Sequence, residues 1–140
     1  MKNEFTPYEQ ALDLKELGFD EPCFGYYLCK NSALGVELEL TTNWIDLFPY
    51  DSSSCKAPLY QQAFRFFREK YEIDVFYWRN SLTDKYRVSE IKISNKEINL
   101  EEKFEDTEYK TYEEAELACL IKLIEILKDS STNNAPTYYN

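Results

Sequence analysis

The sequence predicts a single α+β domain in which helices alternate with antiparallel hairpins, in the order helix-hairpin-helix-hairpin-helix (αββαββα). Three segments have the apolar spacing of amphipathic helices, and two segments between them alternate as paired strands do. Hydrophobic residues make up 44% of the 140 residues, which is enough for one core. We therefore expect one domain over residues 1–128, with an antiparallel sheet packed on the helices, and a disordered tail over residues 129–140.

The first helix is expected to begin after Thr6, a capping residue that is followed by proline and by Glu9. It should end before Gly18, which suits the left-handed position after a helix. Residues 24–28 and 34–41 then read as two strands of a hairpin. The second strand alternates strictly, which places four apolar residues on one face: Leu34, Val36, Leu38 and Leu40.

Residues 42–56 have no clean period and are predicted to form an irregular connection. Pro58 opens a second helix, and residues 73–79 and 86–94 are predicted to form a second hairpin. Residues 95–110 are acidic and weakly patterned, which fits either a third short strand pair or a loop. The core-facing stripe of the second helix is expected to consist of Tyr60, Ala63, Phe64, Phe67 and Tyr71.

The last helix has the clearest local signals. Thr111 and Glu114 are spaced as a capping box, and between Leu117 and Leu127 only Lys122 and Glu125 are polar. Most of the circumference of this helix should therefore be buried.

A short repeat leads all three predicted helices. Tyr8-Glu-Gln-Ala11, Tyr60-Gln-Gln-Ala63 and Tyr112-Glu-Glu-Ala115 are separated by equal intervals of 52 residues (60 − 8 and 112 − 60). A duplication of an αββ unit, closed by one more helix, would explain the spacing. Alternatively, tyrosine and alanine three residues apart simply suit the first turn of an amphipathic helix.

Composition narrows the possible chemistry. The chain has no histidine, so a nucleophile activated by histidine is excluded, and paired carboxylates remain the catalytic option. Its four cysteines form no CxxC pair, which favours reduced thiols and argues against zinc. We expect no catalytic residues, no metal and no cofactor. A net charge of −10 argues against non-specific nucleic-acid binding.

The charge is unevenly distributed, and the best candidate site follows from that. Residues 51–96 carry nine basic and six acidic side chains, whereas both flanking segments are acidic. Arginine forks bind phosphate or carboxylate and stack on aromatic rings. A nucleotide-like anion could therefore be held by Arg65, Arg68, Phe76, Trp78, Arg79 and Arg87. The alternative is that these arginines pair with acidic residues of the same domain.

Two weaker candidates accompany this site. Lys56 could lower the thiol pKa of Cys55, although an ordinary loop cysteine is the simpler interpretation. An acidic strip could engage a basic partner protein or could simply be a solvated face. The strip consists of Glu101, Glu102, Glu105, Asp106 and Glu108.

Three segments also carry a family resemblance: PYEQALDLKELGFDEPCFGYY (7–27), APLYQQAFRFFREKY (57–71) and KTYEEAELACLIKLIEILK (110–128). In this order they resemble a family of small proteins encoded by phages and prophages of gut Bacteroides-type bacteria. The resemblance covers under half of the chain and implies a phage-derived protein acting in a bacterial cytoplasm. The family carries no assigned activity, so the resemblance transfers no functional residue.

The leading hypothesis is a non-enzymatic phage accessory protein that binds a host or phage protein through its acidic surface and exposed aromatic residues. The alternatives are a module that captures a small anionic ligand and a carboxylate-dependent hydrolase. The sequence shows no signal peptide and no run long enough for a membrane helix, so we expect a cytoplasmic protein with no membrane contact. A homodimer could form through an exposed hairpin edge or the apolar last helix, whose residues include Leu120, Ile121, Leu123, Ile124, Ile126 and Leu127.

Overall fold

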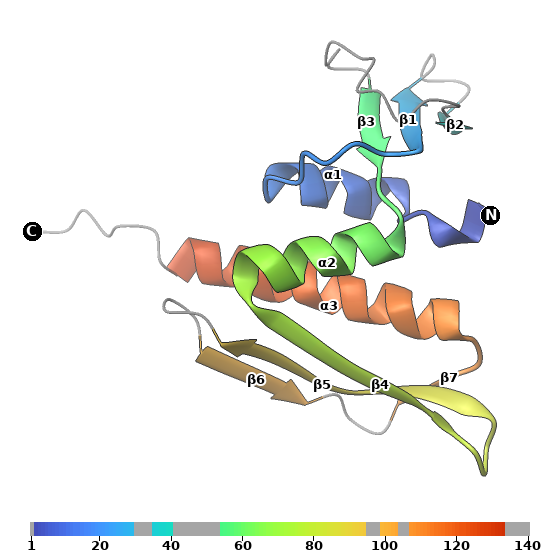
Figure 1. The fold of residues 1–140 in the computed structure, drawn as a ribbon, viewed down its shortest axis with the longest axis vertical. Coiled ribbons are helices and arrows are strands. Elements are labelled where there is room, and N and C mark those ends of the chain that lie inside the picture. The colour runs from blue at the N-terminus through green and yellow to red at the C-terminus, as the bar shows by residue number, and fades with distance from the viewer. Residues whose placement is uncertain (1, 30–34, 41–53, 95–98, 104–106, 134–140) are drawn as a thin grey trace, which may run out of the picture. The chain divides into compact units, whose positions relative to one another are not determined.

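The chain folds into helices and antiparallel sheets, so the predicted α+β class is confirmed (Figure 1). It divides into two compact units, Met1–Phe67 and Arg68–Asn140. The single domain expected over residues 1–128 stays a prediction. The computed structural model describes residues 2–29, 35–40, 54–94, 99–103 and 107–133.

The first unit contains a three-stranded antiparallel sheet in the order β2-β1-β3. Its central strand is β1, where Tyr27 pairs with Leu38 on one side and with Cys55 on the other. The helix α2 (Tyr60–Tyr71) begins in this unit and crosses its boundary. The other elements are η1 (Lys2–Glu4), α1 (Tyr8–Glu16), β1 (Gly25–Cys29), β2 (Val36–Leu40) and β3 (Ser54–Ala57).

The strand β3 lies at the end of the segment predicted as an irregular connection, so that prediction is wrong for residues 54–56. The sequence Ser-Cys-Lys-Ala has no strong apolar alternation, and its strand conformation comes from pairing with β1. Residues 42–53 lie outside the described residues. In β2, Val36 and Leu40 are exposed, whereas Leu38 on the same face is half-buried.

The prediction for α1 is wrong at its amino-terminal end and right at its carboxyl-terminal end. Pro7 is the N-cap residue and no side chain caps the helix, so the predicted Thr6 cap is wrong. Thr6 is instead fully buried: its amide donates to the Pro58 carbonyl at 2.8 Å, and its carbonyl accepts the Tyr27 hydroxyl at 2.5 Å. The carboxyl end matches the prediction, because Gly18 has a φ of 98° and closes the last turn.

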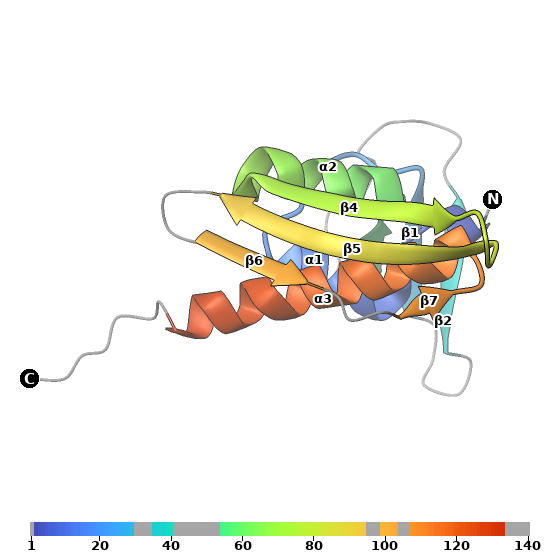
Figure 2. The same ribbon diagram turned by 90° about the horizontal axis from the view of Figure 1, so that it is seen from below.

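The second unit has the strand order β4-β5-β6, and the two-residue strand β7 also pairs with β5 (Figure 2). The predicted second hairpin is present as β4 and β5. Two further strands lie within residues 95–110, where the sequence allowed either a strand pair or a loop. The elements are β4 (Ile73–Asn80), β5 (Lys85–Ser94), β6 (Asn99–Lys103), β7 (Glu108–Tyr109) and α3 (Tyr112–Asn133).

The helix-hairpin alternation is not confirmed as predicted, because each hairpin is extended by further strands.

The helix α3 begins with the predicted capping interaction. The Glu114 amide donates to the Thr111 hydroxyl at 3.1 Å, and the Glu114 carboxylate accepts the Lys110 amide at 3.0 Å. The helix continues to Asn133, into the segment expected to be a disordered tail. Among the described helices, none is both long and apolar enough to cross a membrane.

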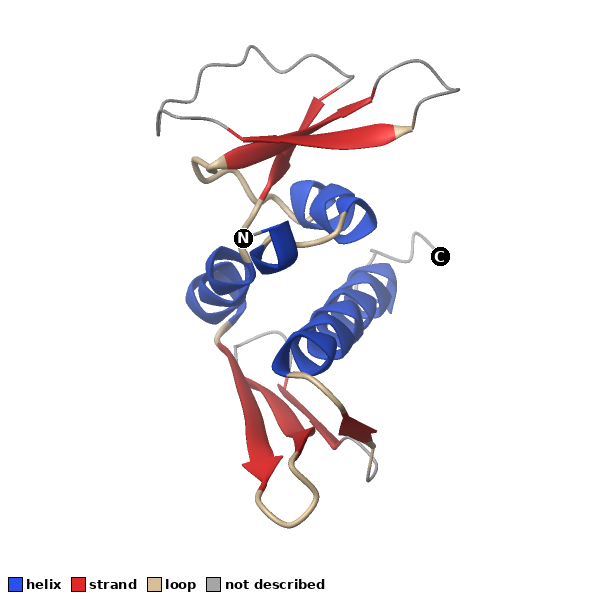
Figure 3. Cartoon of the chain, turned by 90° about the vertical axis from the view of Figure 1, so that its right-hand side faces the viewer, coloured by secondary structure: helices blue, strands red, loops and turns tan. Residues whose placement is uncertain are grey.

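The repeated tyrosine marks the first residue of every α-helix in the described chain. The helices α1, α2 and α3 begin at Tyr8, Tyr60 and Tyr112. Figure 3 shows the helices of the chain in blue. The alanine three residues later is almost completely inaccessible to solvent in each: Ala11, Ala63 and Ala115. The equal spacing therefore corresponds to equivalent helix starts, each with tyrosine as the first helical residue and a buried alanine three residues later.

Candidate functional site: an exposed aromatic face of the second unit

Two large rings lie side by side on β4 and are half exposed. Phe76 has 49% of its surface accessible and Trp78 has 47%, whereas Ile73 has 3%. Side chains alternate between the faces of a strand, so Phe76 and Trp78 share the face opposite Ile73. We call the surface formed by Phe76, Trp78 and Arg87 the aromatic face.

The helix α3 packs on the other side of this sheet. Tyr86 of β5 meets Tyr112 of α3 edge to face, with ring centroids 5.6 Å apart. In the β4–β5 ladder, Tyr86 pairs with Arg79 and therefore shares its face. The next residue, Arg87, pairs with Trp78 on the opposite face. The aromatic face is therefore the side of the sheet that α3 leaves uncovered.

Arg87 joins the two strands at the aromatic face. Its guanidinium carbon lies 5.7 Å from the centre of the Trp78 ring, within the range of a cation–π contact. On its other side, two guanidinium nitrogens donate to one oxygen of Glu108 at 3.1 and 3.0 Å. Arg87 is thus held between a ring and a carboxylate, which restricts its rotamers.

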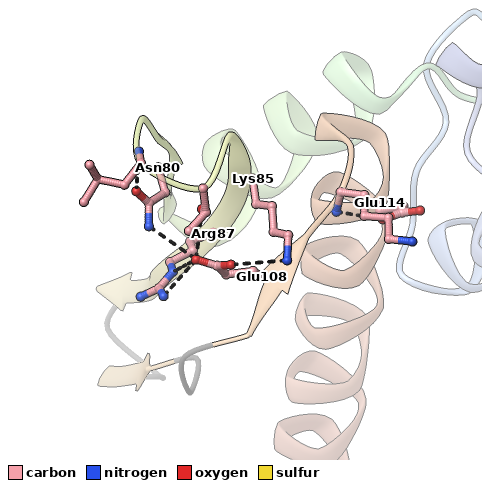
Figure 4. Close-up of polar contacts among 8 residues, drawn as sticks. Asn80, Lys85, Arg87, Glu108 and Glu114 are labelled. Carbon is pink, nitrogen blue, oxygen red and sulfur yellow. Dashed lines mark hydrogen bonds and ion pairs between the residues drawn. The ribbon is translucent and has the colours of Figure 1, made fainter.

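Glu108 is the centre of a polar network at the end of the hairpin (Figure 4). The same carboxylate oxygen accepts hydrogen bonds from the Asn80 amide at 3.3 Å and the Thr83 hydroxyl at 3.2 Å. The Lys85 ammonium lies 3.7 Å from the other oxygen. Asn80 also accepts the Leu82 amide at 3.0 Å, so this network orders the turn between β4 and β5.

The electrostatics of Glu108 follow from these partners. Its side chain is only 17% exposed, and this desolvation alone would raise the carboxyl pKa. Hydrogen bonds from Arg87, Thr83 and Asn80, together with the Arg87 charge, outweigh it and hold the pKa below its ordinary value. Glu108 is therefore ionised at neutral pH and balances the charge of Arg87.

The structure brings together some of the predicted ligand residues. Trp78 and Arg87 are in contact, and Phe76 lies on the same face. Arg68 is exposed. Three of the four arginines pair with carboxylates of their own unit, which is the alternative that the sequence left open. These pairs are Arg65 with Glu21 at 2.8 Å, Arg79 with Asp84, and Arg87 with Glu108.

The acidic strip is only partly described. Glu108 pairs with Arg87 inside the second unit. Glu101 and Glu102 lie in β6, and Glu105 and Asp106 lie outside the described residues. A role of this strip in partner binding stays a prediction.

The cysteines give no second site. Cys55 is buried in β3, not in a loop, and its thiol lies 3.4 Å from the Lys56 carbonyl. Burial raises the pKa of Cys119 to about 12, with a further contribution from Glu116. In the part of the chain that the structure describes, neither of these cysteines forms a disulfide, and Cys23 forms none either. Within the described ranges, no three histidine, cysteine, aspartate or glutamate residues are grouped to hold a metal ion.

One unusual carboxyl group was not singled out from the sequence. Glu116 is half-buried in α3, one residue after the buried Ala115 and three before the buried Cys119. Desolvation, followed by the charge of Glu113, raises its pKa to about 7. The helical period could have located it, because Glu116, Leu120 and Leu123 lie on one stripe.

The comparisons with known proteins add no family to these observations. No protein-family model matches the chain, and searches of curated proteins and of solved structures found no significant match. The resemblance to phage-encoded proteins therefore stays a prediction.

Proposed function

We propose that this chain is a non-enzymatic, phage-derived accessory protein that binds a host or phage protein in the bacterial cytoplasm. The observation that carries this proposal is the aromatic face, where Phe76 and Trp78 each expose about half of their surface. Aromatic residues and arginine are enriched at the centres of protein interfaces. A partner that covers these two rings removes apolar surface from water, which favours association.

The polar network supports the same reading, because it orders the surface before a partner arrives. Glu108 holds Arg87, and Arg87 lies over the ring of Trp78. Asn80 links the turn to the same carboxylate. A partner that docks on an ordered surface loses less conformational entropy, so more of the contact energy appears as affinity.

A small anionic ligand is the second candidate, and the contacts favour it less. Arg65, Arg79 and Arg87 already face carboxylates, so an incoming anion would have to displace those partners. At Arg87 it would also approach the ionised Glu108, which repels it. A protein partner needs no such displacement, because it can cover the rings and leave the pairs intact.

The test is affinity capture from host lysate with the parent chain and the double variant Phe76→Ala plus Trp78→Ala. We expect the parent to retain a stoichiometric protein and the double variant to lose it while keeping its circular dichroism spectrum. Phe24→Ala is the matched control, because Phe24 is an aromatic residue of the first unit with 43% exposure. It should retain the partner.

Two results would overturn the proposal. One is a parent chain that retains no stoichiometric protein, and the other is a folded double variant that retains it as well as the parent does. A melting temperature that rises with a nucleotide or cyclic dinucleotide would favour the ligand alternative, because a ligand bound only by the folded state stabilises it.

A further inference from the structure

The strand β4 is at an open edge of the second unit's sheet. In the described residues it pairs with β5 on one side and with no strand on the other; Figure 2 shows β5 between β4 and β6. An edge strand presents a row of backbone donors and acceptors that another strand can satisfy. Its eight residues make this edge long enough for a strand from another chain.

The edge has few of the features with which proteins block such pairing, because its charged residues, Asp74 and Arg79, lie towards its two ends. The sequence of β4, IDVFYWRN, contains no proline and no lysine. A register shift occurs between Phe76 and Tyr77, but the extra residue is Ser89 on β5, because Glu90 and Val88 are the partners on either side. The β4 backbone itself runs without an inserted residue.

We infer that the occupant of this edge is a second copy of the chain, which pairs β4 with β4 antiparallel around a two-fold axis at position 77. In this register, Phe76 of one copy lies opposite Trp78 of the other, and the same pair forms again across the axis. Cross-strand aromatic pairs are among those that stabilise antiparallel sheets. Each ring is half exposed in the single chain and gains an aromatic neighbour in the pair.

The neighbouring registers are less favourable. An axis at position 76 would place Trp78 opposite Asp74, and an axis at position 78 would place Phe76 opposite Asn80. Both leave a large ring beside a polar side chain. With the axis at 77, Asp74 lies opposite Asn80, so polar residues meet each other at the ends and rings meet in the middle.

The dimer also extends the surface around Trp78. That ring already has Arg87 on the β5 side, and the second copy adds Phe76 on the open side. The two aromatic faces become one strip with four rings. The inference does not depend on the proposed function, because the dimer uses the edge of β4 whereas the partner protein covers its face.

The first test measures molar mass by light scattering over a range of concentrations. The parent chain should approach twice 16.7 kDa as its concentration rises. Phe76→Lys plus Trp78→Lys places two ammonium groups opposite each other and should remain monomeric. Phe76→Glu plus Trp78→Lys places a carboxylate opposite an ammonium group and should restore the dimer. A parent chain that stays monomeric, or two double variants that behave alike, would overturn the inference.

The second test fixes the register. In the proposed pair, residue 77 faces itself at a Cα separation of about 4.5–5.5 Å, which a disulfide can span. Tyr77→Cys should therefore form a covalent dimer on mild oxidation. Val75→Cys should not, because Val75 lies opposite Arg79. The parent chain controls for the native thiols. Covalent dimer from Val75→Cys and none from Tyr77→Cys would reject this register.

A dimer that forms while no partner protein is captured would reject the proposed function alone. Capture of a partner by a monomeric chain would reject the dimer alone, and would leave the β4 edge as a site for a strand of that partner.

Discussion

The two sheets of this chain are built from similar pieces but place their first strand differently. In the first unit, β1 is the central strand between β2 and β3, whereas in the second unit β4 is an edge strand beside β5. Each sheet has a third strand, but β3 joins the first strand of its hairpin and β6 joins the second. The hairpins therefore correspond, and the additions lie on opposite sides.

This difference decides what each first strand does. Gly25, in the central β1, has the Phe5 ring and the Glu39 backbone so close that a Cβ atom there would lie 3.1 and 3.2 Å from them. In the edge strand β4, Phe76 and Trp78 extend into solvent. The same helix start thus precedes a packed strand in one unit and a displayed strand in the other. An αββ duplication stays a prediction, and it would require the third strands to have been added separately.

The largest expected change in stability concerns a feature that both units share, the buried alanine near the start of each helix. Ala63→Leu and Ala115→Leu should each lower the free energy of unfolding by about 1–3 kcal/mol, because three extra carbon atoms enter a site with no accessible surface. Urea denaturation measures the change. Ala118→Leu, at a half-buried position of α3, should have a smaller effect. Equal effects at positions 115 and 118 would mean that the repeated alanine is not a packing requirement.

The next prediction tests the contrast between the first strands. Gly25→Ala should lower the free energy of unfolding by about 1 kcal/mol, since the Glu39 carbonyl belongs to the strand paired with β1 and cannot easily move aside. In the monomeric chain, Phe76→Ala at the exposed edge should stay within about 0.5 kcal/mol of the parent, so both are measured at concentrations where light scattering finds the monomer. The two values come from the same denaturation experiment. If Phe76→Ala were the more destabilising change, the contrast between packed and displayed strands would be wrong.

The helix boundaries were predictable because their signals are local. Proline, the capping pair Thr111–Glu114, Gly18 and the Tyr-x-x-Ala repeat all act within one or two turns. The exception is Thr6, where a capping residue is used for a long-range contact with Pro58 and Tyr27. Only the fold brings those partners together, so the sequence offered the local interpretation instead.

The strand order and the polar network could not be predicted for the same reason. Alternation located both hairpins, and residues two apart in a predicted strand, such as Phe76 and Trp78, fall on one face. It carries no information about which edge receives a third strand, and β3 has no apolar alternation of its own. The contact between Arg87 and Glu108 depends on β7 pairing with β5, and the two residues are 21 positions apart in the sequence.

A smaller change in stability is expected on substitution of Glu108. The polar network around this residue is a feature of the second hairpin. Glu108→Gln should destabilise the chain at pH 7, because Arg87 loses its ionised partner. The folded pKa of Glu108 is lowered, so the stability it contributes is present above about pH 4.5 and is lost as the pH falls through the folded value. Melting curves of the variant and the parent should therefore converge in acid. A constant difference at every pH would show that the charge of Glu108 is not involved.

The smallest expected effect concerns Glu116, whose pKa is displaced in the opposite direction. Its folded pKa of about 7 exceeds the ordinary 4.5, so the folded state favours the protonated carboxyl group. This contribution is fully present below about pH 4.5 and is lost as the pH rises through about 7. Glu116→Gln removes the titration, and the variant should therefore gain stability relative to the parent between pH 5 and pH 8.

Melting temperatures at the two pH values measure this gain. Glu125→Gln is the matched control, because Glu125 is an exposed residue of the same helix whose carboxylate lies 3.6 Å from the Lys122 ammonium. This variant tests whether removing any carboxylate from the helix reproduces the gain. Parallel behaviour of the two variants would mean that Glu116 is solvated like Glu125. The gain in melting temperature should be confined to Glu116→Gln, and the melting temperatures of Glu108→Gln and the parent should converge in acid. Together these results would show that the second unit holds two carboxyl groups whose contributions to stability depend on pH in opposite directions.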